Sequence, residues 1–258
     1  MQYSDIHKAV FLERPNRFIA HCTVDGMLET VHVKNTGRCR ELLVPGATVY
    51  LEKSSNPNRK TAYDLVTVET PFGLVNMDAA APNQVAGELL RAGAILSSPT
   101  LVRPEVRFGA SRLDFYAEND QQRLFVEVKG VTLRQGAWAV FPDAPTVRGT
   151  KHMGELVQAV AQGYRAMALL IVQMGGCTAF RPEPGARTQL FVGHCVRPSC
   201  RCRGASCGLP GNTEYGNCQP RTAGGSGRTQ KLLTNPGGVL KLCNIYRVER
   251  RNVCVDAG

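Results

Sequence analysis

Two acidic residues and one lysine lie close together around a strand–turn–strand segment of this 258-residue chain. Asp114 is followed after twelve residues by Glu127, and Lys129 comes two positions later. Carboxylate oxygens suit Mg²⁺ or Mn²⁺, which activate water and offset phosphate charge, while an amine stabilises developing negative charge. The trio predicts metal-dependent phosphodiester hydrolysis. A Glu-x-Lys pair on an exposed strand is also common as a solvated ion pair, so the surrounding elements must decide.

The segment that carries the trio, 112–129, predicts two short strands joined by a polar turn at 119–122. Apolar and polar residues alternate through the second strand, so Glu127 and Lys129 share one face of it. If the two strands pair, Asp114 on the first strand lies beside them.

The elements around this hairpin predict an α/β unit with helices flanking a central sheet. A strand–helix–strand crossover places the last strand in the same sheet. The second helix has a predicted apolar face of Met153, Leu156, Val157, Val160, Ala161 and Tyr164. The expected elements are a helix at 82–92, strands at 105–109 and 137–141, a helix at 150–164 and a strand at 166–173.

The first part of the chain predicts a small all-β barrel such as an OB-fold. Its expected strands are 6–13, 17–24, 27–34, 47–53, 64–69 and 73–77, with Asp25-Gly26 as a tight turn. Single strands of nucleic acid commonly lie across such barrels. The candidate contacts, which equally suit a solvated sheet surface, are Arg14, Arg17, Phe18, Arg38, Arg40, Arg59 and Lys60.

Three cationic or titratable residues, Arg148, Lys151 and His152, lie at or before the start of the second helix. Backbone N–H groups there attract anions, whereas cations at a helix start oppose the macrodipole. We therefore expect them to contact phosphate, with a proton-shuttle role for His152 as a second interpretation. Asp143 suits either a turn or helix cap or a place near the site.

Charge and cysteine are concentrated at the end of the chain. The net charge is +10, yet residues 186–258 carry 11 Lys and Arg against 3 Asp and Glu. The same part holds seven of the ten cysteines. No run is apolar enough to cross a bilayer, and the first residues lack a signal-peptide layout, so we expect a cytoplasmic protein with no membrane partner.

The stretch 185–258 predicts an irregular, basic, poorly ordered tail rich in Cys, Gly and Arg. We interpret the joint change in charge, cysteine use and periodicity as a possible frameshift, which resequencing the locus tests. A metal knuckle of His194 with Cys195, Cys200, Cys202 and Cys207 is the rival interpretation, although paired Cys-x₂-Cys spacings are absent.

The sequence resembles the sugar fermentation stimulation protein family (SfsA) over residues 1 to about 182. The blocks that carry the resemblance include RPNRF at 14–18, NTGRCREL at 35–42, RLDFY at 112–116, VEVKGVTL at 126–133 and FPDAPTVRGTKHMGEL at 141–156. The resemblance implies a DNA-binding protein with an OB-like domain at 1–81 and a restriction-endonuclease-like PD-(D/E)xK domain at 82–184.

The resemblance also assigns residue roles. Asp114, Glu127 and Lys129 match the nuclease motif, and Glu105 matches an additional acid that assists the metal in this superfamily. Asn35 belongs to a loop that faces DNA or simply makes a turn.

The function that follows is a DNA-binding protein, on single or double strands, with a Mg²⁺- or Mn²⁺-dependent nuclease site. The alternative is a non-catalytic, sequence-unspecific DNA-binding regulator linked to sugar (maltose) metabolism. A third and less favoured hypothesis is a role in RNA processing.

Overall fold

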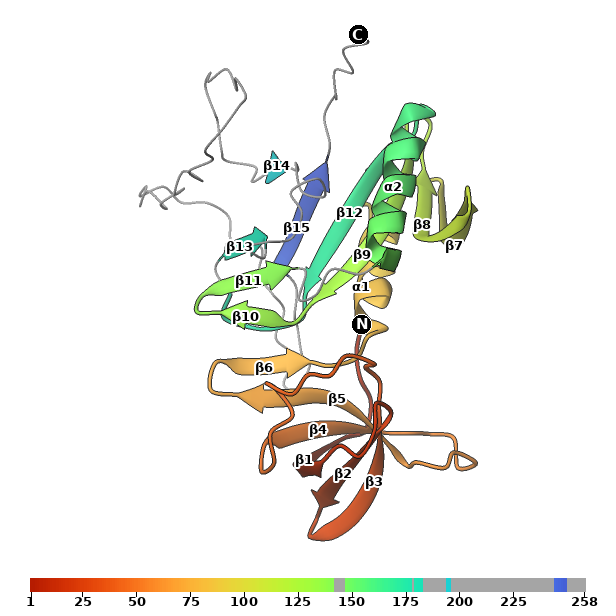
Figure 1. Cartoon of the computed structure of the whole chain (residues 1–258). Coiled ribbons are helices and arrows are strands. Elements are labelled where there is room, and N and C mark those ends of the chain that lie inside the picture. Colours follow the sequence, from red (N-terminus) through yellow and green to blue (C-terminus); the bar gives the residue numbers. More distant parts are fainter. Residues whose placement is uncertain (142–146, 178, 183–193, 196–243, 250–258) are drawn as a thin grey trace, which may run out of the picture.

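The computed structural model describes residues 1–141, 147–177, 179–182, 194–195 and 244–249 of the chain (Figure 1). A β-barrel occupies one end of the molecule, and an α/β unit with a twisted sheet stands on it (Figure 1). Within the described part of the chain, no helix is long and apolar enough to cross a bilayer.

The N-terminal unit is a closed five-stranded barrel of the OB type, as the sequence predicts. Five strands form the ring in the order β3-β2-β1-β4-β5, and a parallel pairing of β3 with β5 closes it. The sixth strand, β6, pairs with β5 outside the ring. Alternation builds its core: Val49 and Leu51 are fully buried, while Tyr50 and Glu52 between and beside them are half-exposed. The strands are β1 (Ile6–Glu13), β2 (Ile19–Val24), β3 (Met27–Val33), β4 (Thr48–Lys53), β5 (Tyr63–Thr70) and β6 (Gly73–Asn76).

The second unit is built around a mixed sheet in the order β14-β15-β12-β9-β8-β7. The helix α1 packs on one face through Ala86 and Leu90, and α2 packs on the other through Leu156 and Ala159. A small sheet of β10, β11 and β13 lies beside it (Figure 1). The elements are α1 (Ala81–Arg91), β7 (Leu101–Phe108), β8 (Ser111–Glu118), β9 (Arg123–Val131), β10 (Leu133–Gln135), β11 (Trp138–Phe141), α2 (Val147–Ala161), β12 (Arg165–Val172), β13 (Ala179–Pro182), β14 (His194–Cys195) and β15 (Asn244–Glu249).

The expected crossover is confirmed. β12 pairs with β9 in parallel, from Arg165 opposite Leu124 to Val172 opposite Val131. The helix α2 connects the two strands over the sheet, so the hairpin that carries the acidic residues lies in the centre of the unit.

The buried face of α2 differs from the predicted apolar face. Val157 and Val160 are 47% and 43% exposed, whereas the polar His152 and Glu155 are buried. The reason is that both polar side chains have partners on the sheet, which decide the rotation of the helix: His152 binds Glu127 and Glu155 binds Ser111.

The end of the chain contributes two short strands that the sequence pattern did not predict. β15 pairs antiparallel with β12, and β14 pairs with β15. The other residues of the predicted irregular tail after 184 lie outside the described residues, as does Asp143.

The two units are joined by main-chain hydrogen bonds as well as by packing. The amide of Asn76 at the end of β6 donates to the carbonyl of Gln173 after β12 at 2.7 Å, and Gly175 donates to Leu74. One cluster of buried apolar side chains runs from the barrel into the second unit, where it includes Leu170. The junction therefore fixes the barrel against the sheet.

Candidate active site

Asp114 occupies the point where β8 and β9 separate. Their paired register begins at Phe115 opposite Val126, and beyond it the Asp114 carboxylate takes the place of a strand partner. Its Oδ2 accepts a hydrogen bond from the backbone N–H of Val128 at 2.7 Å. Asn83 in the first turn of α1 donates through Nδ2 to Oδ1 at 3.0 Å. The carboxylate is therefore held by one strand and one helix.

Glu127 on β9 is 1% exposed and faces α2. Its Oε1 accepts from Lys129 Nζ and lies against His152 Nδ1 of α2. Its Oε2 is buried and has no hydrogen-bond partner among the described residues. A buried carboxylate oxygen without a donor is costly, which indicates a missing partner at this position.

The two carboxylates interact electrostatically. Burial of the Asp114 carboxyl and the nearby Glu127 charge raise the pKa of Asp114 above its ordinary value. Hydrogen bonds from Val128 and Asn83, together with the Lys129 charge, oppose that rise without cancelling it. A bound cation would relieve this repulsion.

The donor set fits Mg²⁺ or Mn²⁺. Hard cations prefer oxygen, and Mg²⁺ in particular is bound by one or two carboxylates while keeping several waters. Asp114 would supply one carboxylate, and the unpartnered Oε2 of Glu127 would supply the other. Among the described residues no group of three or more His, Cys, Asp or Glu side chains gathers as a metal cage.

Glu105 does not join this pair, which departs from the expected metal-assisting role. It falls between Pro104 and Val106, which pair with Phe115 and Leu113 of β8, and its φ of +51° breaks the regular alternation of β7. Its carboxylate instead binds Arg112 at 2.9 Å, and both side chains are 68% exposed.

Four residues predicted to contact nucleic acid are committed to the fold instead. Arg14 donates to four main-chain carbonyls, including those of Asn35, Gly37 and Arg38, and so shapes the loop after β3. Of the two roles predicted for Asn35, the structure shows the turn. Its Oδ1 accepts from the Gly37 N–H, and its Nδ2 donates to the carbonyl of Met77.

The other two committed residues are Arg59 and His152. Arg59 binds both oxygens of Asp64 at 2.6 and 2.8 Å. His152 is buried against Glu127 rather than exposed at the helix start. Its buried ring contacts the Glu127 carboxylate and so positions it.

Six of the predicted cations are on the surface. Lys151 donates to the carbonyl of Ala110 at 3.1 Å while remaining exposed. The other exposed cations are Arg17, Arg38, Arg40, Lys60 and Arg148.

Sequence reasoning missed Asn83, the second holder of Asp114. An asparagine directly after Pro82 at the start of a helix is a recognisable position. Its hydrogen-bond partner Asp114, however, lies on β8, and a local sequence pattern cannot predict that contact.

The chain matches two family models. The SfsA N-terminal OB domain matches residues 12–77, and the sugar fermentation stimulation protein RE domain matches residues 80–190. A sugar fermentation stimulation protein homolog of Ruminiclostridium cellulolyticum is 48% identical over 183 residues, which cover 71% of this chain and 81% of the relative. A homolog of Desulfitobacterium hafniense is 50% identical over 183 residues, covering 71% and 80%.

A solved structure shows the same similarity in three dimensions. It is described as the structure of Pyrococcus furiosus SfsA in complex with Ca²⁺, and it is 30% identical with a TM-score of 0.64. The match covers 70% of this chain and 79% of the Pyrococcus chain. On the family models and the relatives together, the chain belongs to the sugar fermentation stimulation protein (SfsA) family.

Proposed function

We propose that this protein binds DNA and hydrolyses its phosphodiester bonds with Mg²⁺ or Mn²⁺ held by Asp114 and Glu127. One observation carries the proposal: two interacting carboxylates, one with an unpartnered buried oxygen, meet a lysine amine where two central strands separate. When bound, the cation supplies an activated water and offsets charge on the phosphate.

The chain's own residues have distinct tasks in this proposal. Val128 and Asn83 hold Asp114, and His152 holds Glu127. Lys129 is half-buried, with 23% of its side chain exposed, so its amine reaches both Glu127 and an approaching phosphate. A positive charge placed there stabilises the negative charge that develops on the phosphate during hydrolysis.

The DNA partner is supported by the barrel and its surface cations. OB barrels bind single strands on basic and aromatic side chains, and Arg17, Arg38 and Phe18 are all exposed on this barrel, Phe18 to 54%. The family model of the second domain bears the description RE domain, and the Pyrococcus relative is described with Ca²⁺, another hard divalent cation.

The test is cleavage of end-labelled single- and double-stranded DNA by the full-length protein with Mg²⁺ or Mn²⁺. We expect cleavage that a chelator stops and that Asp114→Asn and Lys129→Ala abolish. Asp120→Asn is the matched control, because Asp120 is an exposed acid in the turn of the same hairpin. Cleavage of equal rate in wild type and Asp114→Asn would refute the assignment.

A second candidate is a non-catalytic DNA-binding regulator. The direct contact of Lys129 Nζ with Glu127 favours it, because that ion pair satisfies one carboxylate oxygen without any metal. Relatives named for stimulation of sugar fermentation also suit regulation. DNA binding without metal-dependent cleavage in the same assay supports this candidate and overturns the first.

A further inference from the structure

A cavity of about 240 Å³ lies between the barrel and the α/β unit, beside Asp114. Asn35 from the barrel, Asn83 from α1, Phe141 from β11 and Gln173 after β12 are among the residues that line it. Asn83 and another lining residue, Val128, donate the two hydrogen bonds that hold the Asp114 carboxylate. A ligand in this cavity therefore touches the residues that position the candidate active site.

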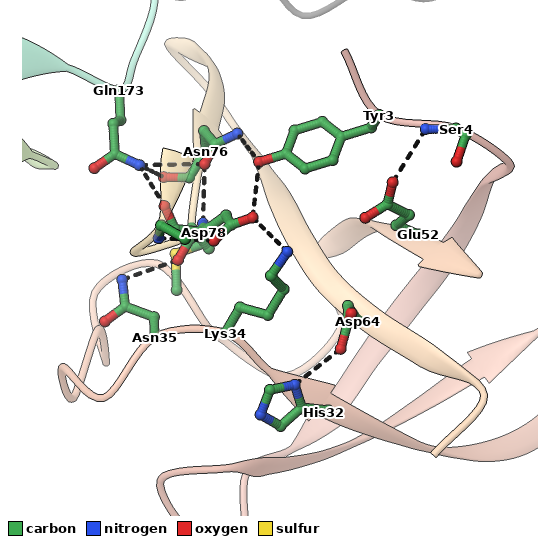
Figure 2. A network of polar contacts seen from close by, with 12 residues as sticks. Tyr3, Ser4, His32, Lys34, Asn35, Glu52, Asp64, Asn76, Asp78 and Gln173 are labelled. Atoms are coloured by element: carbon green, nitrogen blue, oxygen red, sulfur yellow. Dashed lines mark hydrogen bonds and ion pairs between the residues drawn. The ribbon is translucent and has the colours of Figure 1, made fainter. Parts of the chain in front are cut away.

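Gln173 presents a fixed hydrogen-bond acceptor to the cavity. Its side chain is buried, with 5% of the residue exposed, and its Nε2 contacts the main-chain carbonyls of Asn76 at 3.3 Å and Asp78 at 3.0 Å. Because carbonyls only accept, the nitrogen end of the amide must point at them (Figure 2). Its Oε1 has no hydrogen-bond partner among the described residues.

The opposite wall makes room for this acceptor. A Cβ at Gly130 would lie 2.2 Å from Gln173 Oε1 and 2.9 Å from Pro82 Cγ. Only glycine therefore leaves room for Oε1 at this point of β9.

A buried network prevents the Gln173 amide from flipping. Asp78 is fully buried and binds Lys34 Nζ at 2.6 Å, while the Tyr3 hydroxyl donates to its Oδ2 at 3.2 Å. Asn76 Nδ2 donates to that hydroxyl at 2.9 Å, which turns Asn76 Oδ1 toward Gln173 Nε2 (Figure 2). A flipped amide would set Gln173 Oε1 against three acceptor oxygens, which is unfavourable.

Asn83 supplies a second acceptor by the same logic. Its Nδ2 donates to the Asp114 carboxylate, so its Oδ1 is the end left for a ligand. Asn35 is different, since both ends of its amide are committed to Met77 and Gly37. No charged side chain is among the described residues that line the cavity.

We infer that this cavity binds one unpaired, amino-bearing nucleobase of the DNA strand. The exocyclic amine of such a base offers two N–H donors, which complement the two fixed acceptors, and Phe141 lines the cavity as an aromatic surface. The absence of cations among the described lining residues argues against a phosphate ligand. The cavity is also smaller than the roughly 300–1,000 Å³ of pockets for drug-sized ligands, which suits a single base.

This inference rests on the proposed function and names its substrate more narrowly. A base reaches such a cavity only outside the duplex stack, so the expected substrate is single-stranded or locally opened DNA. Adenine, cytosine and guanine carry an exocyclic amine, whereas thymine offers only a ring N–H.

The test compares two oligonucleotides in metal-free buffer by fluorescence anisotropy with the full-length protein. One contains deoxyadenosine, and the other contains purine deoxynucleoside, which is adenine without its amino group. We expect the wild type to bind the adenine strand roughly tenfold more tightly, because the second strand leaves buried acceptors unpaired.

Two variants test whether the preference for the adenine strand arises in this cavity. Ala79 is exposed and lines the cavity, so Ala79→Phe fills it without entering the core; the neighbouring Ala80 is exposed and does not line it. We expect Ala79→Phe to bind both strands equally and Ala80→Phe to keep the preference. Equal binding by the wild type, or a preference that survives Ala79→Phe, overturns the inference.

Because no metal is present, the result is separate from catalysis. A preference for the adenine strand in a protein that does not cleave supports the cavity and refutes only the nuclease. Binding of neither strand overturns the cavity and the DNA-binding proposal together.

Discussion

The contact between His152 and Glu127 gives the most quantitative prediction. Both side chains are nearly buried, with 8% and 2% exposed, and His152 Nδ1 contacts the same oxygen as Lys129 Nζ. Replacing His152 with Leu keeps an apolar body of similar size but removes the donor. A hydrogen bond to a charged group contributes about 1.5–3 kcal/mol, so we expect His152→Leu to lower the free energy of unfolding by about 2 kcal/mol.

The matched variant is His152→Asn, whose amide nitrogen lies near the position of the ring Nδ1. We expect it to recover a large part of the loss, although a smaller side chain leaves some space unfilled. Thermal denaturation in chelator, followed by circular dichroism, measures both variants. For a chain of this size 2 kcal/mol corresponds to roughly 4–8 °C in Tm. Equal Tm values for wild type and His152→Leu would refute the positioning role.

Three further predictions use other parts of the molecule. Gly109→Ala should destabilise the fold more than Gly136→Ala, measured by urea denaturation, because both glycines have positive φ but only at Gly109 does a Cβ lie 2.6 Å from Glu155 Oε2. Equal losses would contradict the close approach. Arg38→Ala should reduce the salt dependence of DNA affinity by about one unit of log–log slope, whereas Arg59→Ala should not, since Asp64 binds its guanidinium; equal slopes would contradict this. Burial alone would raise the pKa of Asp64, but hydrogen bonds from Arg59 and His32 hold it below its ordinary value. The stabilisation that Asp64 contributes is therefore complete above pH about 4 and is lost as pH falls through the lowered pKa. When the free energy of unfolding is measured against pH, Arg59→Ala should lose less stability than the wild type over that acid range.

Local pattern predicted the elements of the barrel and the central hairpin well. Alternating apolar residues define a strand wherever one face is buried, as Val49 and Leu51 show. The crossover rule placed β12 in the same sheet as the hairpin, and the structure shows that its partner there is β9. These predictions succeed because each depends on residues close together in the sequence.

The details of the site depend on contacts between distant segments, which pattern does not encode. His152 was expected to contact phosphate because it lies near a helix start, yet the rotation of α2 buries it against Glu127. The same rotation exposes Val157, which periodicity alone assigns to the core. Glu105 is expected at the start of a strand, yet it lies inside β7, and its carboxylate binds Arg112 on the surface rather than joining the carboxylate pair.

Gln173 shows the same limit at the junction of the two units. In the sequence it is the polar end of an apolar strand, and nothing marks it as a binding residue. Its orientation follows from Asn76 and Asp78, almost a hundred residues earlier in the chain. Such long-range polar networks appear only once the units are placed together.

The most direct test of the active-site assignment is calorimetric titration of Mn²⁺ into the metal-free, full-length protein. We predict saturable binding that Glu127→Gln and Asp114→Asn each abolish and that Asp120→Asn leaves unchanged. Binding that persists unaltered in Glu127→Gln would contradict the claim that the unpartnered oxygen of Glu127 is a metal ligand.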